Sequence, residues 1–260
     1  MNNPLIQWPR AKYWTDCYNP VIGCVKCSPA CKNCYAERVV SRFNMTGCDT
    51  HGFKPTYKAK AKMPNKGVVF CGNMTDLFGD WVNDQELDSW MHLMWRKGEH
   101  DGSEVRKPAY YLWLTKRVRR MANYLNCARN IHGDAGFFGM TAESQEEYDY
   151  RLDEFRYAFG YKRKGWLSAE PLLGPIDLGL GYIAPEDRPF KWVVVGSESG
   201  PERRECRIEW VESIVNQCKL LGIPVFVKQI ELNGRCETDI AKFPEHLQIR
   251  QVPWDFRINK

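Results

Sequence analysis

The chain has 260 residues, of which 43% are hydrophobic and 27% are charged, and its formal net charge is +5. This composition suits one large α/β domain, and the modest positive charge is compatible with a polyanionic partner. The N-terminus has no basic region followed by an apolar core, and no apolar run approaches the roughly 20 residues of a membrane span. From these features we expect a soluble, cytoplasmic protein with reduced thiols.

The first part of the chain is rich in cysteine. A short first strand is predicted at residues 11–16, and five of the eleven cysteines then fall between Cys17 and Cys34. Cys24, Cys31 and Cys34 have the spacing C-x6-C-x2-C on a predicted loop. Three thiolates from one loop can hold three irons of a [4Fe–4S] cluster and leave the fourth iron open to a small molecule, whereas an ordinary ferredoxin closes all four irons with cysteine.

Other interpretations of these cysteines stay open. The two C-x2-C pairs within Cys24–Cys34 suit zinc, although zinc modules usually place a longer segment between such pairs. Simple packing in a core is a further alternative, and an odd cysteine count argues against a disulfide framework. Cys17, Cys24 and Cys27 repeat the C-x6-C-x2-C spacing, but Tyr35 and the helical pattern after it favour the later set.

A helix is predicted at residues 35–43, followed by a stretch at 44–66 that is rich in Gly, Lys and Pro. This stretch contains the basic run Lys54–Lys62. A solvated loop is the ordinary interpretation of such a run, and a loop that contacts phosphate groups is the alternative.

From residue 67 onward, short apolar runs alternate with helical patterns or longer loops. The apolar runs are Gly67–Cys71, Pro108–Leu114, Gly136–Met140, Gly165–Leu167, Lys191–Val195 and Gly222–Val227. The predicted helices are Asp84–Lys97, 117–128, 144–159 and 207–221. Continuous apolar runs of this length are typical of strands buried on both faces of a parallel sheet.

This alternation predicts an α/β fold made of parallel βα units. The first choice is a partial or closed (β/α) barrel of the TIM type with six to seven strands, and the second is a doubly wound open sheet. Residues 1–260 are predicted to form a single domain, with 172–190 a long loop and 234–260 a C-terminal extension.

Polar and charged residues follow each apolar run where the strand is expected to end. They are Asn73, Thr75 and Asp76; Thr115 and Lys116; Thr141 and Glu143; Ser168 and Glu170; Ser197 and Glu198; and Lys228 and Gln229. Any one of them has an ordinary role as a helix cap or turn former. The carboxyl ends of parallel strands hold the active site in α/β folds, so the recurrence predicts a functional edge.

Several motifs carry a resemblance to a known superfamily. They are Cys24-x6-Cys31-x2-Cys34-Tyr35, Met74-Thr75-Asp76-Leu77-Phe78-Gly79, Leu114-Thr115-Lys116-Arg117, Glu170-Pro171, Gly196-Ser197-Glu198-Ser199-Gly200 and Lys228-Gln229. Together they span nearly the whole chain. The chain resembles the radical-SAM superfamily, and within it a phage-encoded family catalogued without an assigned function. Most members of the superfamily use C-x3-C-x2-C, so the longer first gap is a departure.

The resemblance implies a [4Fe–4S] cluster on Cys24, Cys31 and Cys34 that binds S-adenosylmethionine at its open iron. One electron, from an external donor of the flavodoxin or ferredoxin type, would then release a 5′-deoxyadenosyl radical that takes a hydrogen atom from the substrate. By position, the residues expected to bind S-adenosylmethionine are Tyr35, Asn73, Thr75, Thr141, Glu143, Ser168, Gly196 and Glu198. Lys116, Glu170 and Lys228 are the expected catalytic residues, acting on substrate or on a carboxylate.

The expected substrate is a modified nucleobase in DNA or a modified nucleotide, changed by isomerisation or another radical reaction. A base within a duplex would have to be flipped out to reach the site. Repair of a damaged base is a related alternative. A non-catalytic nucleic-acid-binding module stiffened by zinc or by an inert cluster is a second class, and a metal-free barrel hydrolase is a third. The chain lacks the G-x-S-x-G and H-E-x-x-H motifs of common hydrolases.

Overall fold

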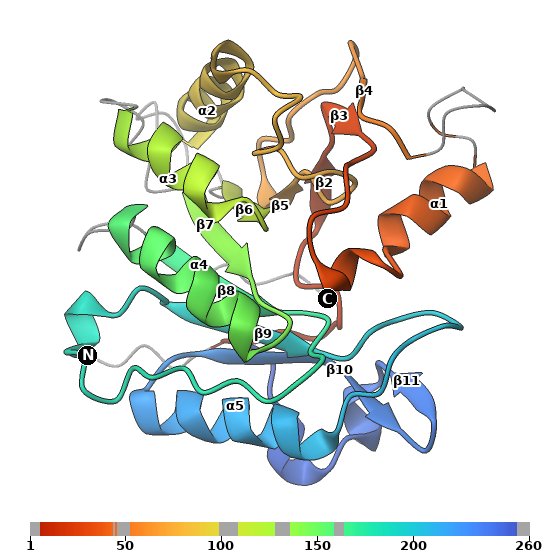
Figure 1. Cartoon of the computed structure of the whole chain (residues 1–260), viewed down its shortest axis with the longest axis vertical. Coiled ribbons are helices and arrows are strands. Elements are labelled where there is room, and N and C mark those ends of the chain that lie inside the picture. Colours follow the sequence, from red (N-terminus) through yellow and green to blue (C-terminus); the bar gives the residue numbers. More distant parts are fainter. Residues whose placement is uncertain are drawn as a thin grey trace. The chain divides into compact units, whose positions relative to one another are not determined.

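The computed structural model describes residues 6–43, 45, 53–98, 109–127, 136–158 and 164–253 (Figure 1). The chain forms two compact units. We call residues 14–139 the N-terminal unit, and residues 1–13 together with 140–260 the C-terminal unit.

The N-terminal unit is built on parallel strands. Its main strands are β2 (Asp16–Tyr18), β5 (Gly67–Cys71), β6 (Ala109–Thr115) and most of β7 (Gly136–Thr141). Strand β5 pairs in parallel with both β2 and β6. A separate antiparallel pair joins β3 (Val21–Ile22) to β4 (Thr56–Tyr57). Its helices are α1 (Tyr35–Phe43), α2 (Asp84–Gly98) and α3 (Val118–Cys127), with a short 3₁₀ helix, η1 (Pro29–Cys31), in the cysteine loop.

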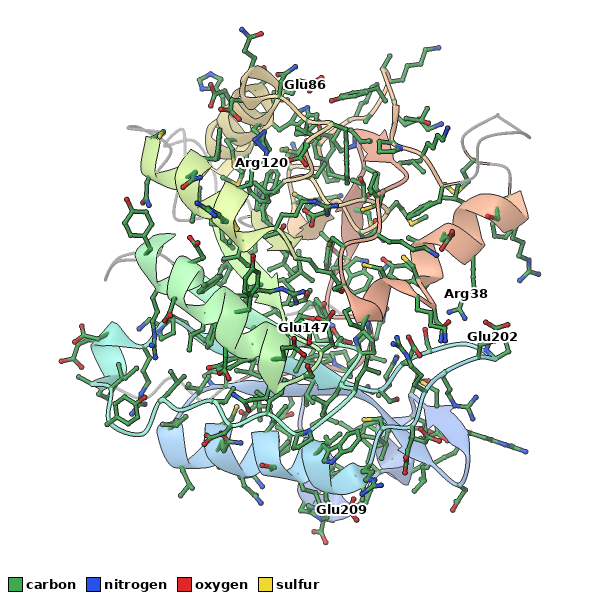
Figure 2. All side chains as sticks on the ribbon, viewed as in Figure 1. Arg38, Glu86, Arg120, Glu147, Glu202 and Glu209 are labelled. Atoms are coloured by element: carbon green, nitrogen blue, oxygen red, sulfur yellow. The ribbon has the colours of Figure 1, made fainter. Side chains whose placement is uncertain are left out.

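Apolar side chains explain this arrangement. Every residue of β5 is buried, as expected for a strand covered on both faces. The ring of Trp113 on β6 stacks on Phe138 of β7, and its indole N–H donates to the sulfur of Met94 on α2 at 3.3 Å. Arg120 of α3, labelled in Figure 2, donates to the carbonyl of Val82, two residues before α2 begins. The contact between Trp113 and Met94 therefore holds α2 to the strands, and Arg120 joins α3 to the segment before α2.

The C-terminal unit has the same type of construction. Its strands β8 (Lys164–Ala169), β9 (Trp192–Gly196) and β10 (Val225–Leu232) are neighbours, with parallel pairing, and β11 (Arg235–Glu237) adds to β10 in antiparallel orientation. The remaining elements are α4 (Gln145–Ala158), α5 (Ile208–Leu221), the pair β1 (Ile6–Gln7) with β12 (Gln251–Val252), and the 3₁₀ helices η2 (Pro185–Asp187), η3 (Ile240–Lys242) and η4 (Glu245–Leu247). Gly222 ends α5 in the left-handed conformation, which caps the last helical carbonyls.

Tyr13 lies in the core of the C-terminal unit. It is 1% exposed, and its ring meets Trp166, Trp192 and Phe226 edge-on at centroid distances of 5.2–6.0 Å. Edge-to-face contacts of this kind add to the free energy gained by burial. The residue that comes just before the N-terminal unit is therefore fixed by the packing of the C-terminal unit.

The structure confirms an α/β fold with mostly parallel strands and the predicted alternation of strands and helices. Two details were wrong. The ladder strands of the described residues number eight rather than six or seven, because the antiparallel β11 adds to the six apolar runs and the strand before the cysteine loop. The first of the parallel strands is β2, Asp16–Tyr18, and not residues 11–16, because the Tyr13 side chain is buried among aromatic rings and the parallel pairing begins after it. The TIM-type barrel stays a prediction.

The predicted first residue of one strand and the predicted last residues of two helices fall outside the described residues. They are Pro108, Ala128 and Phe159. The predicted loop at 172–190 contains only the short 3₁₀ helix η2, whereas the predicted extension from residue 234 contains β11, β12 and two 3₁₀ helices. Among the helices that the structure describes, none is both long and apolar enough to cross a membrane.

Candidate functional site

The cysteine loop leaves β3 through a glycine that no other residue can replace without strain. Gly23 has φ = +96°, and a Cβ atom added to it would lie 2.0 Å from the carbonyl oxygen of Lys54. Its N–H donates to the carbonyl of Met74 at 3.1 Å, and the N–H of Cys24 donates to that of Phe53, also at 3.1 Å. The backbone at Cys24 is therefore held from two sides.

The three cysteines predicted to bind the cluster are free thiols and partly exposed. Cys24 follows Gly23, Cys31 ends the 3₁₀ helix η1, and Cys34 immediately precedes α1. The hydroxyl of Ser28 lies 3.7 Å from the sulfur of Cys31. Cys27, a fourth free thiol on the loop, is exposed.

The thiols of the loop differ in acidity. A hydrogen bond from the Cys27 thiol lowers the pKa of Cys31 to about 4, and the charge of Lys116 contributes to the shift, although desolvation opposes it. The same hydrogen bond raises the pKa of Cys27. Burial and the charge of Asp76 raise the pKa of Cys24 to about 11. One sulfur of the loop is therefore a thiolate at neutral pH, stabilised by a neighbouring thiol and a cation.

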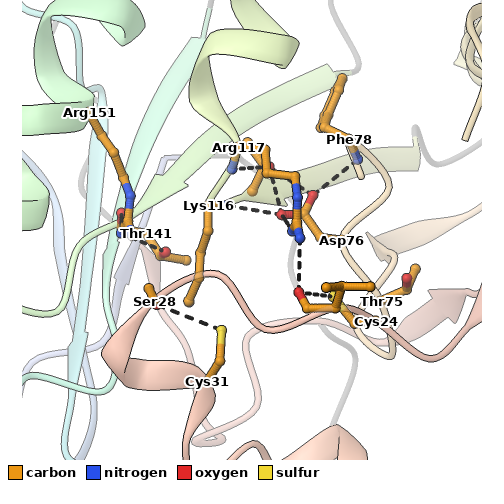
Figure 3. Close-up of polar contacts among 12 residues, drawn as sticks. Cys24, Ser28, Cys31, Thr75, Asp76, Phe78, Lys116, Arg117, Thr141 and Arg151 are labelled. Carbon is orange, nitrogen blue, oxygen red and sulfur yellow. Dashed lines mark hydrogen bonds and ion pairs between the residues drawn. The ribbon is translucent and has the colours of Figure 1, made fainter. Parts of the chain in front are cut away.

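A buried ion pair braces the cysteine loop from the ends of β5 and β6. Asp76 accepts hydrogen bonds from the Thr115 hydroxyl at 2.8 Å, from the backbone N–H of Lys116 at 3.1 Å and from the Arg117 guanidinium at 3.1 Å. Arg117 also donates to the carbonyl of Val25 at 2.8 Å. Figure 3 shows Arg117 lying between Asp76 and the loop that carries Cys24. Arg117 places a positive charge beside the thiols, and its hydrogen bond to Val25 fixes the loop backbone.

Three predicted cofactor-binding residues gather near the same loop. The hydroxyl of Thr75 donates to the carbonyl of Gly23 at 2.5 Å, and the hydroxyl of Tyr35 donates to the carbonyl of Asn73. The side-chain oxygen of Asn73 accepts from Asn19 at 2.8 Å. The end of β5 therefore contacts both the start of the cysteine loop and the first residue of α1.

The donors of the loop fit an iron–sulfur cluster in kind, since they are several unpaired thiols on one loop beside cationic side chains. Among the described residues, no three His, Cys, Asp or Glu side chains are grouped closely enough to hold a metal ion. A single zinc needs such convergence, with each sulfur about 2.3 Å from the metal. The cysteines of a [4Fe–4S] cube bind different irons. Binding of a metal cluster by Cys24, Cys31 and Cys34 therefore stays a prediction.

A second group of predicted residues meets at the ends of the C-terminal strands. The ammonium of Lys228 lies 2.9 Å from a carboxylate oxygen of Glu170. The other oxygen accepts from the hydroxyls of Ser168 at 3.1 Å and Tyr13 at 3.4 Å. A Cβ atom added to Gly196 would lie 3.1 Å from the carboxylate of Glu170, so the glycine leaves room for it. Two of the predicted catalytic residues, Glu170 and Lys228, are thus in direct contact.

The other predicted residues of the C-terminal unit are engaged by arginines. Arg151 donates to the Glu143 carboxylate at 2.7 Å and to the carbonyl of Thr141 at 2.8 Å, and Glu143 is only 1% exposed. Glu198 is 4% exposed and accepts from Arg204 through the backbone N–H at 2.9 Å and through the guanidinium. Both carboxylates are buried and held by arginines, although the Arg204 side chain is 28% exposed, so a ligand would compete with these arginines for them.

From the sequence, Asp76 is expected at a strand end but has no predicted role, and no role is predicted for Arg117 or Tyr13. The available signal for Asp76 and Arg117 was opposite charge at the ends of consecutive apolar runs. Nothing local to residues 8–16 indicates that Tyr13 reaches Glu170, since that contact depends on the packing of the strands.

Comparison with known proteins identifies the family. The model described as "Protein of unknown function (DUF5131)" matches residues 9–246. The chain belongs to this family. No curated protein and no solved structure matches the chain. Membership of the DUF5131 family covers the cysteine loop and all the strand ends discussed above, but the family description assigns no activity. The resemblance to the radical-SAM superfamily therefore stays a prediction.

Proposed function

We propose that the chain is a radical S-adenosylmethionine enzyme that modifies or isomerises a nucleobase in DNA. The observation that carries this proposal is the braced cysteine loop. Cys24, Cys31 and Cys34 lie on one loop with free sulfurs, and the loop is held by Arg117 and Thr75 from neighbouring strand ends.

Cys24, Cys31 and Cys34 would hold a [4Fe–4S] cluster, and S-adenosylmethionine would bind at its open iron. When bound and reduced by an external flavodoxin or ferredoxin, these groups would supply a 5′-deoxyadenosyl radical for hydrogen abstraction. The chain itself supplies position and charge. Arg117 and Lys116 offset the negative charge of the thiolates, and a charge held in a fixed place favours one redox state of the group it faces.

Residues around the end of β5 would orient the cofactor. The proposal assigns Tyr35, Asn73 and Thr75 to contacts with S-adenosylmethionine, because their backbone and side-chain groups meet beside the cysteine loop. In the C-terminal unit it assigns Glu170 and Lys228 to substrate. The pair offers an anionic and a cationic group side by side, with Ser168 and Tyr13 holding the carboxylate by hydrogen bonds.

The test is electron paramagnetic resonance on protein purified without oxygen and reduced with dithionite, with and without S-adenosylmethionine. A [4Fe–4S]⁺ signal that changes on adding the cofactor is expected. The C24S, C31S and C34S variants should lose iron, whereas C127S should keep it, because Cys127 is an exposed thiol at the end of α3.

Two results would overturn the proposal. A signal that ignores S-adenosylmethionine in the wild type, and loss of iron in a C27S variant, would mean a fully ligated cluster with Cys27 as the fourth ligand. Zinc in place of iron after anaerobic purification would favour a binding module stiffened by metal.

A further inference from the structure

The positive charge of the chain is concentrated in one segment of the N-terminal unit. Residues 14–66 contain nine Lys or Arg and three Asp or Glu, a net charge of +6. The rest of the chain contains 28 Lys or Arg and 29 Asp or Glu, a net charge of −1. The charge of +5 for the whole protein therefore comes from the segment that carries the cysteine loop.

Most of these cations face solvent. Six exposed ones have no ion pair with any acidic residue in the part of the chain that the structure describes: Lys32, Arg42, Lys54, Lys60, Lys62 and Lys66. Lys26, by contrast, pairs with Glu37 at 2.8 Å. Cations that stabilise a fold usually have such partners, whereas unpaired ones at high density attract a polyanion.

Packing and hydrogen bonds join the segments that carry these basic residues. Phe53 packs on the cluster formed by Ile22, Ala36 and Val40, which joins the residues before β4 to α1. The ammonium of Lys58 donates to the carbonyl of Met45 at 2.6 Å. With the β3–β4 pairing, these contacts hold α1, the cysteine loop and residues 53–58 together. We call this the basic surface: residues 25–43 and 53–66.

Three exposed aromatic rings lie on the basic surface. Phe43 is 65% exposed, Tyr57 is 46% exposed and Tyr35 is 44% exposed. The hydroxyl of Tyr57 donates to the carbonyl of Trp81 at 2.6 Å, so its ring is held in place while much of it remains open to solvent. Rigid exposed rings interleaved with lysines are the pattern by which proteins bind single-stranded nucleic acid, with bases stacked on the rings and phosphates on the cations.

We propose that the basic surface binds single-stranded DNA and thereby brings an unpaired base to the cysteine loop. This inference rests on the proposed function for its choice of substrate, but it concerns binding, which is measurable without turnover. A single strand is favoured over a duplex because the bases of a duplex are stacked on each other and cannot stack on Phe43 or Tyr57.

The test measures the affinity of anaerobically purified protein for a labelled oligo-dT of 20 nucleotides by fluorescence anisotropy, at salt concentrations between 50 and 200 mM. Each cation–phosphate contact with a single strand contributes about −0.7 to the slope of log K against log salt. Four contacts, from Lys54, Lys60, Lys62 and Lys66, predict a slope of about −2.8, which is about a 50-fold loss of affinity over this range. A K60Q/K62Q/K66Q variant should have a slope smaller in magnitude by about 2.

The control removes equal charge from the C-terminal unit. The K219Q/R235Q/K242Q variant changes three exposed cations there and should retain the wild-type slope. For stacking, F43A should weaken binding about 10-fold with an unchanged slope, and F43Y, which retains a ring at this position, should bind like the wild type. Y150A, which removes a ring 78% exposed elsewhere, should have no effect.

The proposal is overturned if the two triple variants lose affinity equally, because the attraction would then be general. It is also overturned if a duplex, or an oligo-rU of the same length, binds more tightly than oligo-dT. Circular dichroism and iron content, measured on every variant, separate lost binding from lost folding. If the basic surface binds DNA but the cluster signal does not respond to S-adenosylmethionine, this inference holds and the radical mechanism is rejected. If the cluster signal responds to S-adenosylmethionine but the basic surface does not bind DNA, the radical mechanism holds and this inference is rejected.

Discussion

Replacing Asp76 should destabilise the N-terminal unit and loosen the cysteine loop. Asp76 joins the end of β5 to Thr115, Lys116 and Arg117. The D76A variant leaves the Arg117 guanidinium without its carboxylate, and breaking one partner of a buried pair costs about 3–5 kcal/mol. Since the Arg117 side chain is 15% exposed, water can partly solvate it, so we expect the lower end, about 3 kcal/mol.

The measurement is urea unfolding of the wild type, D76A and a matched control, D84A. Asp84 pairs with Arg120 at a similar distance, 3.0 Å, but its side chain is 69% exposed, so its removal should cost less than about 1 kcal/mol. Loss of Arg117 from the carbonyl of Val25 should also speed alkylation of Cys24 in D76A. If D76A and D84A lose equal stability, the brace described above does not hold the loop.

Three further predictions concern single residues. G23A should lower the free energy of unfolding by about 3 kcal/mol or more and abolish iron loading, because a Cβ atom would meet the Lys54 carbonyl. G222A, with open space around the new Cβ atom, should cost about 1 kcal/mol. Equal costs for the two variants would contradict the steric explanation. E143A should lower the free energy of unfolding by about 3–5 kcal/mol by leaving Arg151 buried and unpaired, and thermal denaturation that matches the wild type would contradict this. In the metal-free protein, iodoacetamide should label Cys31 at pH 6, because the pKa of this thiol is lowered to about 4. The folding stability that the thiolate provides should be lost as the pH falls through that value. If mass spectrometry finds Cys31 unlabelled at pH 6, the thiolate assignment is wrong.

The alternation of elements followed from the sequence because its causes are local. Strand β5 and helix α1 have the bounds that the apolar pattern predicted, Gly67–Cys71 and Tyr35–Phe43. A run of buried β-branched and aromatic residues specifies a strand by itself, and Gly222 ends a helix by its own conformational freedom. The spacing of Cys24, Cys31 and Cys34 likewise placed three thiols on one loop before a helix.

The tertiary structure decided which of the polar residues meet. Glu170 pairs with Lys228, and Asp76 with Arg117, because neighbouring strands bring their carboxyl ends together. Glu143, for which a cofactor contact stays a prediction, pairs with Arg151 in a buried position. Tyr13, expected within the first strand, lies among aromatic rings of the C-terminal unit. Most of these partners are far from each other in the sequence. Where they are closer, several charged residues would be equally suitable partners. A local pattern shows that a charge lies at a strand end, but only packing determines which group neutralises it.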